Sequence, residues 1–135
     1  MNDVDLLRGL NDKRNRLAAA LRKLRADFAE ALPEYEYKGI LSRASSLLEA
    51  QEDRIQAFAE LDLEHRPHTE AELEDVLDVL LRVAHFPRMV HALGQVLVQE
   101  RKDSALSKIQ RDAGDAAAQL EHICRCWGAA NLEER

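Results

Sequence analysis

Apolar residues recur at every third or fourth position over long parts of this chain, and this spacing predicts helices. The first run covers about residues 3–32 and is interrupted by one polar residue, Arg14. A spacing held over so many turns is typical of a helix packed along a bundle or a coiled-coil seam. We therefore expect a long, heptad-like first helix that ends at Pro33. Its apolar positions are Leu7, Leu10, Leu17, Leu21, Leu24, Phe28 and Ala31.

Two more runs follow, over about residues 40–63 and 70–86. The first of them has the same spacing as the first helix. The second starts after Thr69, which together with Glu72 has the spacing of a capping box. Apolar residues cover most of the circumference of 70–86, which is typical of a central, buried helix. The apolar stripe of 40–63 consists of Leu41, Ala44, Leu48, Gln51, Ile55 and Phe58.

Pro87 predicts a break or a kink, because proline restricts the residue before it and suits the first position of a new helix. Beyond it, the apolar sets of 88–102 and 104–130 point roughly 170° apart on one helical wheel. Either the chain breaks near 102–104, with Asp103 or Ser104 as a cap, or one unbroken helix presents its two faces to different partners. We favour the break.

These runs predict an all-α fold, an antiparallel bundle of four to five helices over about 3–32, 40–63, 70–86, 88–102 and 104–130. The composition agrees, because 46% of residues are hydrophobic and only 4% are aromatic. Three prolines and five glycines are too few to supply the turns of a many-stranded protein. The length of 135 residues suits a single domain, which we expect to span 1–135.

The net charge is −6, and no apolar run is long enough for a membrane span. The start of the chain also lacks the pattern of a signal peptide. Two cysteines that are two residues apart do not form a disulfide framework. We therefore expect a cytoplasmic protein without membrane contact.

Both cysteines lie in the stretch HICRCW, residues 122–127, which also holds the single tryptophan. Helical spacing places Cys124 on the apolar face, and places His122 and Cys126 together on the polar side. Three ligands at i, i+2 and i+4 of a helix cannot converge on one metal ion. We therefore predict a buried core thiol at Cys124, and no metal site unless a partner chain supplies the remaining ligands.

Two acidic pairs raise another possibility, Glu49 with Glu52 and Glu72 with Asp75. This arrangement resembles the paired acidic motif of MazG-like all-α nucleotide pyrophosphohydrolases. The resemblance implies that the four carboxylates bind Mg²⁺ against the phosphates of a nucleotide, as hard oxygen ligands can. The same residues also suit the solvated faces of two acidic helices. We favour the solvated faces, because Glu49 and Asp75 lie far around the helix from the apolar stripes.

The sequence has no Gly-rich phosphate loop and no nucleophile motif, so we assign no catalytic residue and no cofactor. The leading prediction is a non-enzymatic protein–protein interaction module, such as an adaptor, a chaperone or an inhibitor or immunity-type protein. We expect it to be oligomeric, because an apolar seam left unburied within one chain requires another chain. The residues predicted to bind a partner are Tyr35, Tyr37, Leu106, Ile109, Leu120 and Trp127.

A third interpretation is nucleic-acid binding through the basic side of the first helix. Residues 1–32 carry seven basic and five acidic side chains. We do not favour this interpretation, because nucleic-acid binding needs a basic surface and charge runs on helices are usually solvated. The basic residues concerned are Lys13, Arg14, Arg16, Arg22, Lys23 and Arg25.

Overall fold

The computed structural model describes residues 3–37, 44–101 and 104–131. Within these ranges the chain forms only α-helices, and no strand occurs. The predicted all-α fold is therefore confirmed, with four helices. They are α1 (Asp3–Tyr37), α2 (Ala44–Glu60), α3 (Glu70–Arg101) and α4 (Ser104–Asn131).

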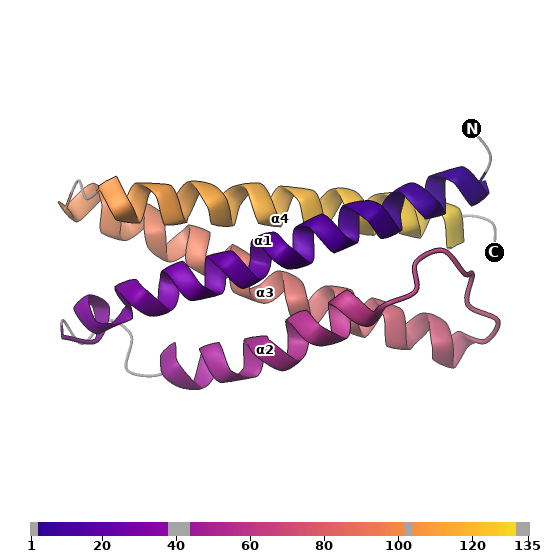
Figure 1. The fold of residues 1–135 in the computed structure, drawn as a ribbon, viewed down its shortest axis with the longest axis horizontal. Coiled ribbons are helices and arrows are strands. Elements are labelled where there is room, and N and C mark those ends of the chain that lie inside the picture. Colours follow the sequence, from indigo (N-terminus) through magenta and orange to yellow (C-terminus); the bar gives the residue numbers. More distant parts are fainter. Residues whose placement is uncertain (1–2, 38–43, 102–103, 132–135) are drawn as a thin grey trace.

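The four helices form an antiparallel bundle in which each helix packs against two neighbours. α1 contacts α2 and α4, and α3 contacts the same two helices from the other side. Figure 1 shows successive helices running in opposite directions, with the start of α1, the end of α4 and the connection between α2 and α3 at one end. Short connections between antiparallel neighbours give this up-and-down arrangement directly.

The apolar stripes predicted along the chain form the core. Leu10, Leu17 and Leu21 of α1 are almost completely buried, as are Phe58 of α2 and Leu120 of α4. The buried residues separate into two clusters stacked along the bundle. The larger cluster is at the end with the α2–α3 connection. The smaller cluster consists of Leu24, Phe28, Leu48, Phe86, Val90, Ile109 and Ala113.

The two predicted helix ends at proline are wrong. α1 continues through Pro33 to Tyr37, and α3 continues through Pro87 to Arg101. A proline inside a helix removes one backbone hydrogen bond, and its ring clashes with the carbonyl four residues earlier, at a cost of about 3 kcal/mol. At Pro87 the packing compensates, because Phe86 and Val90 on either side of it are buried in the smaller cluster. The Phe86 ring also meets the ring of Phe28 edge to face, with 5.7 Å between the centroids.

The predicted break near 102–104 is confirmed, since α3 ends at Arg101 and α4 begins at Ser104. The two helices fold back on each other, so Val90 of the first apolar set and Ala113 and Leu120 of the second all face the core of the same chain. Asp103 as a cap lies outside the described residues, and so does the side chain of Ser104. The predicted central, buried position of 70–86 is wrong, because this part of α3 exposes much of its surface, including Leu81.

The second helix ends three residues earlier than predicted, at Glu60. The side chains of α1 bind the connection that follows. Arg14 donates a hydrogen bond to the carbonyl oxygen of Leu61, and the amide of Leu63 donates to Oδ1 of Asn11 at 3.2 Å. Leu63 is fully buried in the larger cluster. These contacts with α1 replace the next turn of α2.

α3 begins at the predicted capping box. The amide of Glu72 donates to Oγ1 of Thr69 at 3.1 Å, which satisfies one of the free donors of the first turn. The Glu72 carboxylate in turn accepts from the amide of His68 at 2.7 Å. These bonds fix where the connection stops and the helix starts.

Candidate functional site

The four carboxylates of the possible magnesium site do not come together. All four residues are exposed, and two of them have other partners. Glu52 lies 3.4 Å from Nη1 of Arg25, and Glu72 caps α3. Over the part of the chain that is described, no three His, Cys, Asp or Glu side chains are placed to hold a metal ion. The arrangement therefore gives Glu49, Glu52, Glu72 and Asp75 no shared metal.

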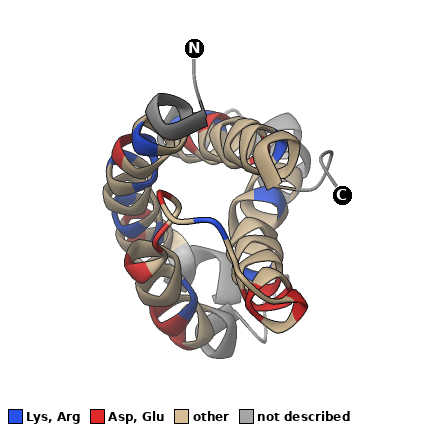
Figure 2. Cartoon of the chain, turned by 90° about the vertical axis from the view of Figure 1, so that its right-hand side faces the viewer, with Lys and Arg blue, Asp and Glu red and all other residues tan. Residues whose placement is uncertain are grey.

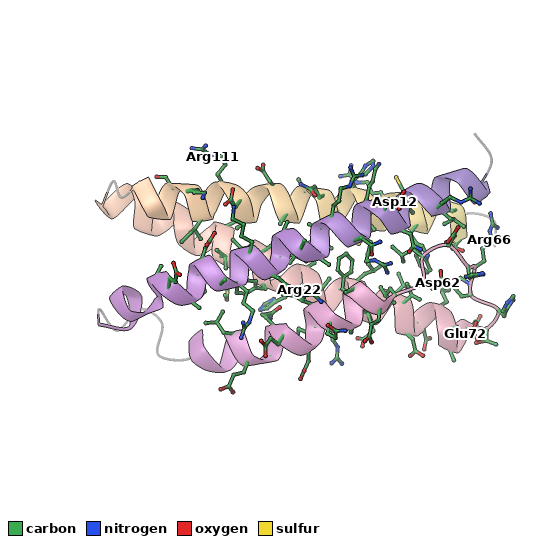
Figure 3. The ribbon with its side chains drawn as sticks, in the orientation of Figure 1. Asp12, Arg22, Asp62, Arg66, Glu72 and Arg111 are labelled. Atoms are coloured by element: carbon green, nitrogen blue, oxygen red, sulfur yellow. The ribbon has the colours of Figure 1, made fainter. Side chains whose placement is uncertain are left out.

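The basic residues of α1 face three different directions. Arg14 lies in the core, while Arg22 and Arg25 face α2, where they donate to Gln56 at 3.0 Å and to the carbonyl of Leu48 at 3.0 Å. Figure 3 shows Arg22 between these two helices. Figure 2 shows basic and acidic residues interspersed over the helices. The predicted basic side of α1 is thus not one continuous surface. The remaining three residues, Lys13, Arg16 and Lys23, line grooves between α1 and α4.

Arg14 occupies the polar position in the apolar stripe of α1, and it is only 6% exposed. Burial lowers the pKa of its guanidinium, and the nearby charge of Asp62 opposes that shift. Asp62 in turn organises the α2–α3 connection, because its carboxylate accepts from the amide of Glu64 at 3.0 Å and contacts the imidazole of His65. Burial alone raises the pKa of Asp62, but these hydrogen bonds together hold it below its ordinary value.

Three of the residues predicted to bind a partner are buried within this chain. Ile109 is 8% exposed, and Leu120 and Trp127 are each 1% exposed. Within this chain they face the core, where α4 packs against α1 and α3. Their role in binding a partner stays a prediction. The side chains of Tyr35, Tyr37 and Leu106 lie outside the described residues; the backbone of both tyrosines belongs to α1, which replaces the predicted loop.

The apolar surface left open lies on the first half of α3. Leu81 is 69% exposed, and no other large hydrophobic side chain among the described residues is exposed. Leu77, one turn earlier on the same side, is half-buried against the larger cluster. We call Leu77 and Leu81 the α3 edge. In the sequence, the α3 edge is visible only as part of the apolar coverage of 70–86, a pattern that predicts a central helix.

The HICRCW stretch forms one side of a polar cluster between α4 and α1. His122 and Cys126 share the outer side of α4 as predicted, with 3.7 Å between Nε2 and Sγ. The Nζ atom of Lys13 lies 3.2 Å from the same Nε2 atom. Cys124 is half-buried against the larger cluster rather than fully buried, and burial raises the pKa of its thiol.

A comparison with known proteins gives this chain no relative: no family model, no curated protein and no solved structure matches it. Within the described ranges, none of the helices combines the length and the apolar character that crossing a membrane requires. Function therefore has to be argued from the surfaces of the bundle itself.

Proposed function

We propose that this protein is a non-enzymatic interaction module of the cytoplasm, a small helical bundle that binds another protein and associates with copies of itself. The adaptor, chaperone and inhibitor or immunity-type proteins expected from the sequence all belong to this class. The proposal is supported mainly by the α3 edge.

The α3 edge is an apolar surface that the bundle does not use. Leu81 is 69% exposed, whereas the other apolar stripes are buried where the structure describes their side chains. Covering a leucine side chain is worth about 1.5–3 kcal/mol, so this surface favours association with an apolar partner surface. Around it, Asp78 and Arg82 form an exposed pair with 3.0 Å between the carboxylate and Nε. An apolar centre with a charged rim is the usual anatomy of an interface.

The substitution Leu81→Lys tests this proposal. The side chain is mostly outside the core, so the unfolding free energy should change by no more than about 0.5 kcal/mol. Association should weaken strongly, because a charge then occupies the centre of the contact. Sedimentation velocity over a range of concentrations measures self-association. A pull-down from the native host, followed by mass spectrometry, measures capture of another protein.

Ala19→Lys is the matched control, since it adds the same charge at another exposed position, on α1. We expect it to leave both measurements unchanged. A wild-type protein that stays monomeric at high concentration would remove the self-association part. Partner capture that is equal in wild type and Leu81→Lys would show that the α3 edge is not the binding surface.

A further inference from the structure

A groove of about 450 Å³ lies between α1 and α4. It does not include the α3 edge. Sites for small molecules typically have volumes of about 300–1,000 Å³, so this groove has room for a small ligand. α1 supplies two long basic side chains, and α4 supplies a floor of small and apolar residues with two polar groups. The lining residues are Lys13, Arg16, Ala118, Gln119, His122 and Ile123.

The groove is locally basic although the whole chain carries a net charge of −6. Of the described residues that line it, none is an aspartate or a glutamate. Lys13 lies 3.2 Å from the imidazole of His122, a partner that does not neutralise it. Arg16 is exposed and forms no ion pair with any of the described carboxylates. Two cations thus face the same opening, and none of the described residues that line it supplies a counter-charge.

The next groove along the same two helices shows the contrast. It has a volume of about 230 Å³, and there Lys23 of α1 faces Asp112 and Asp115 of α4. The same pair of helices therefore supplies carboxylates opposite one lysine and none opposite Lys13 and Arg16. Lys13 and Arg16 can therefore pair with an anion from solution.

The floor of the groove indicates what else the ligand carries. Ala118 offers exposed apolar surface above the buried Ile123, and the methylene stems of Lys13 and Arg16 extend it. We propose that this groove binds a small amphipathic anion, an aliphatic carboxylic acid whose carboxylate meets Lys13, Arg16 and His122 and whose chain lies on Ala118 and these methylene stems.

Titration calorimetry with octanoate tests this inference. Acetate, which has the carboxylate without the long chain, and octanol, which has the chain without the charge, are the comparison ligands. We expect octanoate to saturate one site per chain, and both acetate and octanol to bind at least about tenfold more weakly. Lys13→Ala with Arg16→Ala should weaken octanoate binding by roughly tenfold, as expected for two partly solvated charge contacts. Both residues are exposed, so circular dichroism should show an unchanged fold.

Lys23→Ala is the matched control, because it removes one positive charge from the neighbouring groove. It should leave octanoate affinity within about twofold of wild type. The inference is overturned if octanoate shows no saturable binding, or if octanol binds as tightly as octanoate. It is also overturned if the Lys13 and Arg16 substitutions change nothing, or if Lys23→Ala weakens binding as much as they do.

Discussion

Gly114 of α4 lies directly against the imidazole ring of His91 on α3. A Cβ atom placed on Gly114 would be 2.9 Å from Nδ1 of His91, closer than such atoms approach without a shift of one of them. The ring is held there, because Nδ1 also lies 3.2 Å from the carbonyl oxygen of Gln110. Only glycine at this position lets the two helices pack at their present separation.

Gly114→Ala should therefore destabilise the bundle even though alanine is the better helix former. Alanine favours the helix by about 1 kcal/mol, and overpacking of a filled contact costs about 1–3 kcal/mol. We expect a net loss of unfolding free energy, measured by urea denaturation. Gly9→Ala is the control, because nothing lies within 4 Å of a Cβ there, and it should stabilise the protein by about 0.5–1 kcal/mol.

The cause of that loss can be isolated with a second substitution. In a His91→Ala background the ring is absent, so Gly114→Ala should become neutral or stabilising. A double-mutant cycle on the four proteins measures the coupling between the two positions. Coupling near zero would mean that some contact other than the His91 ring limits position 114.

Arg14→Ala should destabilise the protein by about 1–3 kcal/mol, because the carbonyl of Leu61 then loses its buried donor. Arg16→Ala, two residues away and exposed, should change the unfolding free energy by less than about 0.5 kcal/mol. Thermal unfolding followed by circular dichroism distinguishes the two. Equal effects would show that Arg14 contributes only its helix propensity.

Gln51→Leu should stabilise the protein. The Gln51 side chain is fully buried, and neither atom of its amide has a hydrogen-bond partner among the described residues. A buried amide without a partner costs about 1–3 kcal/mol, and leucine has a similar volume without polar atoms. Gln56→Leu is the control: Gln56 is exposed and bonded to Arg22 and Glu60, so denaturation should show no gain there.

The pKa of Asp62 is held below its ordinary value of 3.8, and this fixes a pH dependence. The stability gained from the ionised carboxylate is present above 3.8 and is lost as the pH falls below it, through the lower pKa of the folded protein. Asp62→Asn should therefore be less stable than wild type near neutral pH. The difference should shrink at acidic pH, which denaturation at several pH values would reveal. A difference that is constant with pH would show that the ionised form of Asp62 does not add to the stability of the folded protein.

The helices could be predicted from the sequence because their signals are local. The spacing of Leu10, Leu17 and Leu21 indicates one face of one helix. The Thr69–Glu72 cap indicates where one helix starts. The position of Arg14 in the stripe of α1 was equally visible. Its role was not, because its acceptor lies 47 residues further along the chain.

The features that could not be predicted depend on how the elements meet. The proline rules describe an isolated helix, so they could not foresee that packing around Phe86 and Val90 carries α3 through Pro87. The same limit applies to the α3 edge: an apolar circumference is compatible with a central helix and with an outer helix that keeps an open side. Only the number of neighbours decides between them, and it follows from the fold-back between α3 and α4. That fold-back also placed Leu120 and Trp127 in the interior.

The hydrogen bonds between α1 and residues 61–63 have a practical consequence for anyone who engineers this protein. Exposed connections are normally the safest places to lengthen a chain or to insert a tag or a protease site. Here the start of the α2–α3 connection behaves as part of the interior, since the backbone of Leu61 and Leu63 is bonded to α1 and Leu63 fills the core. Insertions should therefore disrupt folding between Glu60 and Leu63.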